Sequence, residues 1–533
     1  MFHLEKRLIA IFTAFCLTIG CICLKLCIIS ITGDELVPSE THFTAYKLYD
    51  VRGNISDCNG KRLTERDYDN VVIAKATQQS ADMLSELADS KSFTEISRRI
   101  KNGFPVMFNI GSRSIIPTDD FKCYRAYKRY SDSHIAQHII GYLDSELHGI
   151  SGIEKAFDDL LYIGREVYAR VPSDALGRSI TGGEIEIHTE ASTSVTIRLT
   201  LDYDLQQTVE NALDEGGITE GCAIVTDIKS GAIRAMVSRP SFDADRVADY
   251  LDSEGSPLLN RCLQSYAVGS VFKVAVAAAA TEAGLENFVC NCSGSCNVGG
   301  VVFGCSGNTV HGKVDLQKAL EVSCNTYFIS LGQKLGTNKI LEAAGLLGFG
   351  QVNRLCDGIS ADEGTVPSRE ELKNPAALAN FSFGQGSFTA SVFQISQMIS
   401  AIGGSGKYYE PYLVEEIIDS DGASQKHRLK YPVTAFEEKT ADSMAKMLTS
   451  VVTNGNAAAA KPASFNAAGK TATAQTGIYD SNGNELCNTW FAGFFPAENP
   501  QYTVVIMKQG GVSGAYDCAP VFKSIADKII LPN

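Results

Sequence analysis

One short stretch constrains the fold of this chain more than any other: Tyr266-Ala-Val-Gly-Ser-Val-Phe-Lys273, followed at once by an alanine-rich run. Alanine has the highest helix propensity and Gly284 ends the run, so the sequence predicts a helix over residues 274–281. Ser270 then lies at or near the N-terminus of this helix, and Lys273 lies one turn later on the same face. The rest of the fold has to hold this pair in place.

A serine and a lysine placed in this way can act as a nucleophile and its base. A serine hydroxyl is a weak nucleophile until a base removes its proton. Lysine becomes such a base when burial lowers its pKa, and the apolar neighbours Val271, Phe272 and Val274 favour burial. A second Ser-x-x-Lys pair, Ser443 and Lys446, occurs in the chain. About two such pairs are expected by chance in a chain of this length, so the spacing alone decides nothing.

Two further motifs follow in the chain. Ser323 and Asn325 place a hydroxyl and an amide two positions apart at the start of a predicted helix with an apolar face. Gly469-Lys-Thr-Ala-Thr-Ala-Gln475 then places a cation and a hydroxyl on a predicted strand. Each motif recurs elsewhere, as Lys439-Thr-Ala441 does in an acidic loop. Only one set of the three motifs lies, in chain order, at the start of a helix, at the start of a second helix and on a strand. Its members are Ser270 with Lys273, Ser323 with Asn325, and Lys470 with Thr471.

An apolar run of 24 residues, 8–31, lies near the N-terminus and follows Lys6 and Arg7. As a helix it spans roughly 36 Å, against about 30 Å of membrane hydrocarbon. Lys25 interrupts the run near its far end, where its ammonium can reach the headgroups. We therefore predict a transmembrane anchor over 8–31, with residues 1–7 as a cytoplasmic tail, because positive charges stay on the cytoplasmic side.

Two other interpretations of this segment were weighed. A cleaved signal peptide would need a shorter apolar core and a cleavage site of small residues. A lipid-modified Cys21 after Ile19-Gly20 would need a better flanking sequence, and the apolar run continues past it. A retained anchor fits the pattern best.

Length, composition and net charge limit the classes of protein to which the chain can belong. The chain has 533 residues, enough for two or three domains, and 44% of them are hydrophobic, as in globular proteins. The net charge is −14 and no basic stripe is present. Since contacts to phosphate need clustered Lys and Arg, we predict that the chain binds no nucleic acid.

The sixteen cysteines include two groups. Four lie in the predicted anchor, where they act as small apolar residues. The other group lies in a loop rich in Gly and Ser, and disulfides, free thiols and a zinc site are all open interpretations of it. Its spacing matches no established ligand pattern, and we predict no metal among the catalytic residues. The loop group consists of Cys290, Cys292, Cys296 and Cys305.

The pattern of elements predicts a mixed α/β (α+β) fold in which helices cover an antiparallel sheet. The character of the chain changes near residue 192. After it we expect strands at 195–202, 222–228, 233–237, 470–475, 489–495 and 501–508, and helices at 205–213, 315–335, 337–345 and 520–530.

The three motifs together resemble those of penicillin-binding transpeptidases and serine β-lactamases: Tyr-x-x-Gly-Ser-x-Phe-Lys, then Ser-Cys-Asn-Thr-Tyr-Phe 53 positions after the serine, then Gly-Lys-Thr-x-Thr-Ala-Gln. Other stretches extend the resemblance to class B penicillin-binding proteins over almost the whole chain. It implies a pedestal domain of the dimerisation type over 32–191 and a transpeptidase domain over 192–533. The additional stretches are Arg52–Gly60, His138–Gly141, Gly149–Glu154, Thr200–Gln206, Ser238–Asp243 and Phe383–Gly386.

The resemblance also implies an activity, that of a membrane-anchored peptidoglycan D,D-transpeptidase that needs no cofactor. Ser270 would attack the D-Ala–D-Ala carbonyl of a stem peptide, or a β-lactam, and become acylated. Lys273 would accept its proton. Ser323 would relay a proton to the leaving D-Ala, and Asn325 would orient Lys273 and the substrate backbone.

The third motif would bind the substrate. Lys470 and Thr471 would hold its terminal carboxylate. The backbone N–H groups of Ser270 and Thr473 would form the oxyanion hole. The predicted anchor places the protein in the cell membrane with a single pass, its catalytic domain outside the cytoplasm and its N-terminal helix in contact with membrane lipid. The resemblance implies stem peptides, β-lactams and a polytopic lipid II polymerase as partners.

Three departures from the family pattern qualify these expectations. Ala472 stands where glycine is usual, so an extra methyl group would crowd the substrate, and an unfavourable φ would cost about 1 kcal/mol. Val268 stands where proline is common, and Cys58 where arginine is common. Two alternatives therefore stay open: a D,D-carboxypeptidase or β-lactamase, and a weakly active or non-catalytic β-lactam-binding scaffold or sensor.

Overall fold

The computed structural model of the protein divides into two compact units. The first comprises residues 1–50, 68–127 and 166–190, and the second comprises 51–67, 128–165 and 191–533. The predicted domain boundary at residue 192 stays a prediction. The residues that the structure describes are 2–32, 42–88, 90–180, 182–189 and 194–529.

In the first unit, one helix among the described residues is long and apolar enough to cross a membrane. Its apolar part is Lys6–Cys27, with a mean hydropathy of 2.2 and no buried residues. Strands β4-β3-β5 form an antiparallel sheet that packs with two helices around Val72, Leu84 and Ile96. The elements wholly or mainly in this unit are α1 (Phe2–Thr32), α2 (Gln78–Leu87), α3 (Ser90–Lys101), β1 (His42–Arg52), β3 (Tyr68–Ala74), β4 (Val106–Gly111), β5 (Phe121–Tyr127), β6 (Tyr162–Ser173) and β7 (Glu186–His188).

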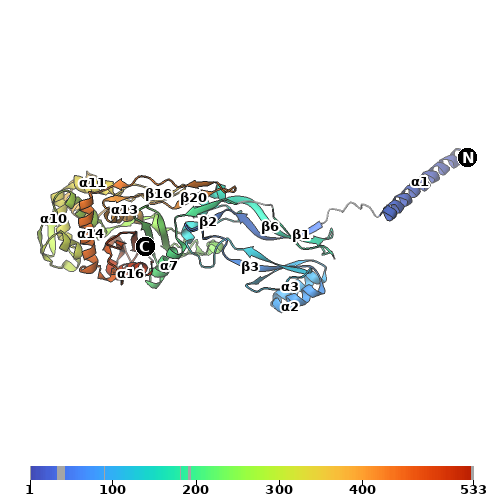
Figure 1. The fold of residues 1–533 in the computed structure, drawn as a ribbon, viewed down its shortest axis with the longest axis horizontal. Helices are drawn as coiled ribbons and strands as arrows, with labels where there is room; N and C mark the ends of the chain where they lie inside the picture. Colours follow the sequence, from blue (N-terminus) through green and yellow to red (C-terminus); the bar gives the residue numbers. More distant parts are fainter. Residues whose placement is uncertain (1, 33–41, 89, 181, 190–193, 530–533) are drawn as a thin grey trace. The chain divides into compact units, whose positions relative to one another are not determined.

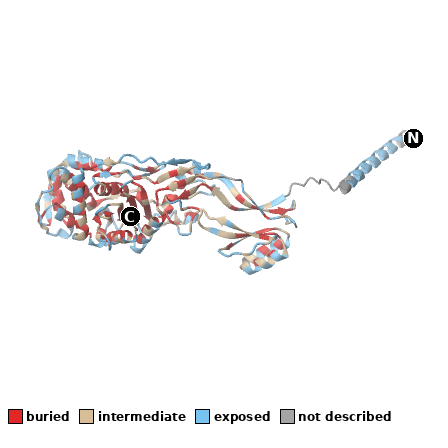
Figure 2. Ribbon diagram, in the orientation of Figure 1, coloured by how far each residue is buried: buried red, intermediate tan, exposed pale blue. Residues whose placement is uncertain are grey.

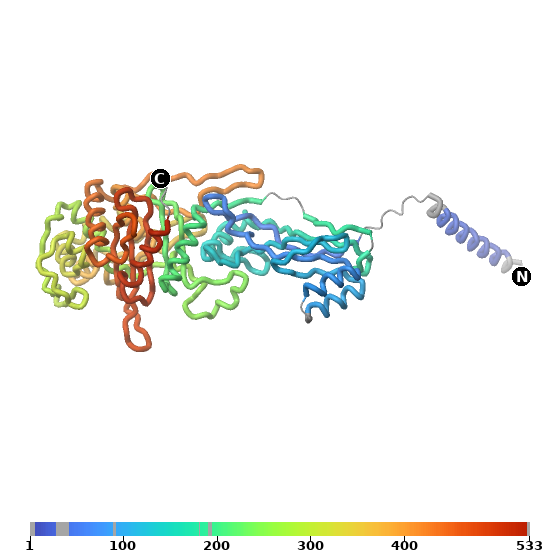
Figure 3. Tube along the Cα trace, turned by 60° about the horizontal axis from the view of Figure 1, so that its bottom comes forward, coloured from blue at the N-terminus to red at the C-terminus, as the bar shows by residue number. Residues whose placement is uncertain are grey.

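The second unit is built on a five-stranded antiparallel sheet of order β10-β9-β25-β24-β23. The predicted strands at 222–228 and 233–237 and the three predicted C-terminal strands are confirmed. The β23–β24 hairpin extends away from the rest of the sheet (Figure 3), and Ile478 and Tyr479 near its tip are exposed. The strands are β9 (Gly221–Asp227), β10 (Ile233–Arg239), β23 (Ala468–Tyr479), β24 (Glu485–Phe495) and β25 (Tyr502–Lys508).

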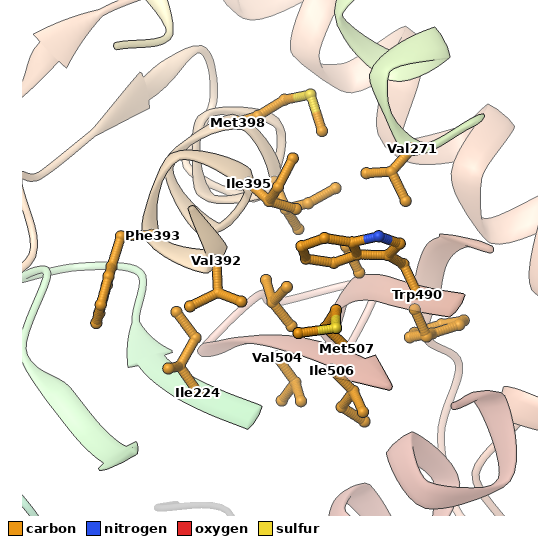
Figure 4. Packing of buried hydrophobic residues seen from close by; sticks show 14 of the residues in the cluster. Ile224, Val271, Val392, Phe393, Ile395, Met398, Trp490, Val504, Ile506 and Met507 are labelled. Carbon is orange, nitrogen blue, oxygen red and sulfur yellow. The ribbon is translucent and has the colours of Figure 1, made fainter. Parts of the chain in front are cut away.

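Helices cover both faces of this sheet. Trp490 is fully buried among side chains of α13 (Val392–Gly403), which include Ile395 and Met398 (Figure 4). Side chains of successive strand residues point to opposite faces, and the next residue, Phe491, packs against Phe522 of α16 (Ala519–Lys528) with ring centroids 4.4 Å apart. Helices therefore pack on both faces of the sheet, which explains why β24 is buried from residue 488 to residue 495. Buried residues likewise fill the interior of this unit (Figure 2).

The longer helices of the second unit confirm the predictions at 205–213, 337–345 and 520–530. They are α7 (Tyr203–Glu215), α8 (Lys273–Glu282), α9 (Leu316–Glu321), α10 (Asn325–Leu335), α11 (Thr337–Leu346), α12 (Pro375–Ser382), α13 (Val392–Gly403), α14 (Glu438–Thr453) and α16 (Ala519–Lys528) (Figure 1). The short ones are α4 (Gln137–Ile140), α5 (Gly152–Ala156), α6 (Asp158–Leu161) and α15 (Gly514–Asp517).

The remaining strands of the second unit form small sheets. The largest has the order β2-β8-β20-β21, with β2 (Asn54–Ser56), β8 (Thr196–Leu199), β20 (Val414–Ile418) and β21 (Ser424–Lys426). The two-stranded pairs are β11 (Ser265–Ala267) with β18 (Thr389–Ser391), β12 (Cys290–Cys292) with β15 (Gly312–Val314), β13 (Ser295–Val298) with β14 (Val301–Gly304), β16 (Asn353–Cys356) with β17 (Ile359–Ala361), and β19 (Lys407–Tyr408) with β22 (Val433–Thr434).

A buried cluster of ion pairs lies in the second unit, centred on Glu154 of α5. Glu154 is fully buried, and its carboxylate accepts hydrogen bonds from Arg52 Nε and Arg129 Nε, each at 2.7 Å. Arg52 also pairs with Asp158 at 2.5 Å, and Arg129 with Glu65 at 3.1 Å. Glu154 is thus shared by two guanidinium groups that have little contact with water, and each of them has one further carboxylate partner.

Replacement of Glu154 by glutamine is expected to lower the free energy of unfolding by about 3 kcal/mol, because it breaks two buried ion pairs and leaves each guanidinium group with a single carboxylate partner. The matched control is Glu342→Gln on α11, which removes an exposed pair with Lys339 and is expected to cost less than about 1 kcal/mol. Urea unfolding of the two variants and the parent measures the difference. Equal losses in both variants would contradict the importance of the buried cluster.

Candidate active site

Ser270 lies on a 3₁₀ turn, Gly269–Phe272, that runs directly into α8. The predicted helix is confirmed, and it ends before Gly284, whose φ is +70°. Its residues from Lys273 to Ala280 are all buried, which small alanine side chains allow between neighbouring helices. The turn therefore presents Ser270 at the N-terminal end of a helix that is fixed in the core.

The backbone of the stretch Phe383–Gly386 packs against this turn and is hydrogen-bonded to it. The N–H of Gly269 donates to the carbonyl of Gly384 at 2.9 Å. A Cβ atom at Gly384 would lie 2.0 Å from the carbonyl oxygen of Gly269, and φ at Gly384 is +83°. Only glycine satisfies both conditions, so this stretch supports the conformation around Ser270.

Ser323 lies in the break between α9 and α10, and Asn325 is the first residue of α10. The predicted helical stretch at 315–335 is thus two helices joined by a tight turn. Ser323 has φ of +53°, which is uncommon for a residue other than glycine and marks a strained turn. The side-chain amide of Asn325 donates to the carbonyl of Gly304 at 2.8 Å, which ties the turn to β14.

Lys273 joins the first two motifs. Its Nζ donates to the carbonyl of Ser323 at 2.8 Å, to the Ser323 hydroxyl at 3.1 Å and to Oδ1 of Asn325 at 2.6 Å. The side chain is fully buried, and burial lowers the pKa of Lys273 to about 7. A substantial fraction of this lysine is then neutral near pH 7, as a general base requires.

The third motif lies on β23, next to the Ser270 turn. A Cβ atom at Gly269 would lie 3.2 Å from the carbonyl oxygen of Thr473, so the strand and the turn are in close contact. Lys470 is fully buried and donates to the carbonyl of Thr471 at 2.9 Å. Burial, and then the nearby charge of Lys273, hold the pKa of Lys470 well below its ordinary value.

One cleft of about 890 Å³ brings the motifs together, within the usual range for small-molecule sites. Lys273 and Lys470 do not line it but are buried directly behind residues that do. The catalytic and binding roles of all seven residues stay predictions. The five that line the cleft are Ser270, Ser323, Asn325, Thr471 and Thr473.

Ala472 does not carry the backbone strain that its departure from glycine suggests. Its φ is not in the left-handed region, and it pairs in regular register with Trp490 of β24. The residue lines the cleft, and its side chain belongs to the buried core. The backbone strain of about 1 kcal/mol is therefore absent, because any residue type can adopt the extended backbone conformation of this strand position.

The sequence did not point to three contacts of this site. Asn456 accepts a hydrogen bond from the Thr471 hydroxyl at 3.3 Å, Gly304 binds Asn325, and the ring of Phe328 lies 5.5 Å from Lys273 Nζ. Phe328 belongs to the second motif and follows Asn325 by three positions, so helical spacing could have indicated it. Asn456 lies in a loop and Gly304 at the end of β14, and neither position carries such a signal.

Comparison with known families shows to which family the chain belongs. The model of the penicillin binding protein transpeptidase domain matches residues 221–528, more than half of the chain. The chain belongs to the penicillin-binding protein transpeptidase family. This confirms the resemblance to class B penicillin-binding proteins, and it places the chain among the serine-type acyltransferases.

Individual relatives of this family member extend over most of the chain. Stage V sporulation protein D of Bacillus subtilis is 28% identical over 490 residues, which cover 85% of this chain and 73% of the relative. Peptidoglycan D,D-transpeptidase MrdA of Haemophilus influenzae is 27% identical over 421 residues, which cover 71% of this chain and 62% of the relative. The chain thus spans less than two thirds of the length of the second relative.

Solved structures of the family share the fold. Penicillin-binding protein 3 of Mycobacterium tuberculosis has a TM-score of 0.65 at 23% identity, over 91% of this chain and 96% of that one. A D,D-transpeptidase domain from Eggerthella lenta has a TM-score of 0.63 at 24% identity, over 90% of this chain and 97% of that one. The predicted fold class is therefore confirmed.

Proposed function

We propose that the chain is a membrane-anchored peptidoglycan D,D-transpeptidase that crosslinks stem peptides through a Ser270 acyl-enzyme and is acylated by β-lactams. The observation that carries the proposal is the convergence of three motifs, far apart in the sequence, on one cleft around a buried lysine. Chance Ser-x-x-Lys pairs lack this convergence, since Ser443 and Lys446 lie on α14 and Lys446 is exposed.

Acylation begins with attack of Ser270 Oγ on the carbonyl carbon of the penultimate D-Ala. The hydroxyl proton passes to the neutral Nζ of Lys273, and a C–O bond forms. The C–N bond to the terminal D-Ala then breaks, and Ser323 delivers a proton to the leaving nitrogen. The 3.1 Å hydrogen bond between Lys273 and the Ser323 hydroxyl supports this relay, because it links the base to the acid.

The third motif supplies substrate binding. A substrate carboxylate beside Lys470 favours the ammonium form and offsets the effect of burial, so binding and protonation of Lys470 support each other. The Thr471 hydroxyl, which donates to Asn456 in the structure, lines the cleft and would turn to donate to the substrate carboxylate instead. The N–H groups of Ser270 and Thr473 stabilise the oxyanion that develops as the carbonyl is attacked. The amine of a second stem peptide then attacks the acyl-enzyme and releases Ser270.

The location and partners in this proposal follow from the N-terminal helix and the relatives. A single pass through the cell membrane, with the N-terminus in the cytoplasm, places the catalytic domain outside it. β-Lactams are proposed ligands because penicillin-binding protein 3 of M. tuberculosis has been solved as complexes with aztreonam and ampicillin. A polytopic lipid II polymerase that contacts the anchor and the pedestal is the proposed protein partner.

Product analysis tests the proposal directly. The full chain in detergent is incubated with a donor stem peptide that ends in D-Ala–D-Ala and with an acceptor stem peptide. We expect release of D-Ala together with a crosslinked dimer. Release of D-Ala with hydrolysed donor alone would instead show a carboxypeptidase. Acylation by benzylpenicillin without either product would show a β-lactam-binding scaffold or sensor.

The rate of acylation by benzylpenicillin is expected to depend on the ionisation of Lys273. Only the neutral amine accepts the serine proton, and burial lowers the pKa of Lys273 to about 7. The second-order rate constant should rise about tenfold between pH 5 and 6 and level off above the pKa. Stopped-flow or quenched mass spectrometry measures it. A rate that does not change over this range, with folding unchanged by circular dichroism, would exclude Lys273 as the base.

A further inference from the structure

Three thiols and one imidazole meet beside the cleft, and the predicted mechanism uses none of them. Cys292 ends β12, Cys305 follows β14, His311 precedes β15, and Cys324 precedes α10. The four potential ligand atoms all lie within 4.8 Å of one another. We infer that these side chains form a structural Zn²⁺ site, and this inference does not rest on the proposed function.

The separations between the ligand atoms fit one tetrahedral ion. With bonds of about 2.3 Å to sulfur and about 2.0 Å to nitrogen, a tetrahedral zinc ion places two sulfurs about 3.8 Å apart and a sulfur and a nitrogen about 3.5 Å apart. The Sγ atom of Cys305 lies 3.7 Å from that of Cys292 and 3.8 Å from that of Cys324. Cys292 Sγ lies 3.4 Å from Nδ1 of His311. These three of the six separations agree with the geometry of a shared ion, and the other three are no longer than 4.8 Å.

The donor set selects zinc among common ions. Thiolate and imidazole ligands suit Zn²⁺ and disfavour Mg²⁺, Ca²⁺ and Mn²⁺, which bind oxygen. A disulfide would require two sulfurs about 2.05 Å apart, would use two of the three thiols, and would leave the histidine without a role. Binding of the ion releases the thiol protons, so that three thiolates and a neutral imidazole surround it.

The protein supplies all four ligands, so the site is structural in type. Cys292, Cys305 and Cys324 are buried, with exposed fractions of 1%, 4% and 0%. His311 is half-buried at the wall of the cleft. No position is left for a water molecule or substrate among these four ligands, so the ion would organise the fold rather than take part in the reaction.

The site would fix the strained turn that Lys273 binds. Cys324 stands between Ser323 and Asn325, and Cys305 follows Gly304, whose carbonyl accepts the 2.8 Å hydrogen bond from Asn325. One ion would therefore bind the residue next to the donor and the residue next to the acceptor of this hydrogen bond. Its bonds to Cys324 and Cys305 would hold the φ of +53° at Ser323 and the direction of the Asn325 side chain.

The structure also separates the cysteines that the sequence grouped together. Of the loop cysteines, only Cys292 and Cys305 belong to the cluster. Cys296 instead packs with Phe303 in a small separate apolar cluster, and Cys290 is two positions before Cys292 on β12 and outside the set of four. Cys290 and Cys296 are therefore matched controls, since they are cysteines of the same loop without a ligand role.

The experiment measures zinc in the full chain, purified in detergent under reducing conditions without chelator. Elemental analysis is expected to find close to one zinc per chain in the parent and in Cys290→Ala and Cys296→Ala. His311→Ala and Cys305→Ala are expected to lose nearly all of it. Replacement of zinc by Co²⁺ in the parent should give the intense visible bands of a tetrahedral thiolate site, and these bands should be absent from Cys305→Ala.

His311→Ala keeps the measurement meaningful if the cysteine variants fold poorly, because His311 is the least buried of the four. A parent that carries no zinc and gives no Co²⁺ spectrum would overturn the inference. A mass lower by two hydrogens, with a Cys305–Cys324 crosslink found after proteolysis, would overturn it in favour of a disulfide. Zinc lost equally from Cys290→Ala and Cys305→Ala would also overturn the assignment of the ligands. These readouts are independent of crosslinking activity.

Discussion

Ser270→Ala is expected to abolish the covalent adduct that the parent chain forms with benzylpenicillin. The adduct requires an oxygen nucleophile at this position, and the half-buried side chain can be shortened to a methyl group without opening a large cavity. Removal of a catalytic serine from an enzyme of this chemical type lowers turnover by about 10⁴-fold or more. Intact-mass spectrometry of the full chain in detergent measures the adduct.

The chain itself provides the matched control for this variant. Ser443→Ala removes a serine with the same spacing to a lysine, Lys446, but on the surface-facing side of α14. It is expected to acylate at the rate of the parent. An undiminished adduct on Ser270→Ala would place the nucleophile elsewhere. Lack of an adduct on a well-folded parent would show a closed cleft and favour the scaffold alternative.

The sequence predicted the central sheet and the longer helices because their signals are local. Apolar strands with turns at Ser481-Asn-Gly483 and Glu498-Asn-Pro500, and the alanine-rich run after Lys273, each specify an element without reference to the rest of the chain. The order of the three motifs predicted one site, and the structure brings them to one cleft. Resemblance to a family supplied the roles that spacing alone left undecided.

Contacts that depend on tertiary structure were not predictable in this way. The cysteine cluster combines positions from 292 to 324, and its members are set by two hairpins and a helix start rather than by spacing. Cys290 and Cys296 have the same side chain and the same loop context, yet they fall outside the cluster. Likewise, the concern about Ala472 depended on its φ angle, which only the strand register of β23 determines.

Lys273→Met is expected to lower the rate of acylation by benzylpenicillin about 10²–10⁴-fold, the usual contribution of a general base. Methionine matches the length of the lysine side chain but cannot accept a proton. It also leaves the carbonyl of Ser323 and Oδ1 of Asn325 without the donor that binds them at 2.8 Å and 2.6 Å. The Ser323–Asn325 turn therefore loses its connection to α8 as well as its base.

The thermal stability of Lys273→Met is expected to show whether Lys273 has a catalytic role or a structural one. The pKa of Lys273 is about 7 in the folded chain, against an ordinary value of 10.5. Between these values the unfolded chain binds more protons, so the lysine destabilises the fold there, and less so as the pH rises. Removal of the lysine relieves this penalty but also removes three hydrogen bonds, so the two effects oppose each other, and the melting temperature at pH 7.5 is expected to stay within a few degrees of that of the parent.

Lys446→Met on α14 is the control, because it removes an exposed lysine with the same spacing to a serine and should leave both the acylation rate and the melting temperature unchanged. A large fall in the melting temperature of Lys273→Met, with acylation retained, would make this lysine a structural residue. Slow acylation by Lys273→Met at an unchanged melting temperature would identify Lys273 as the base, because the substitution would then impair the reaction without destabilising the fold.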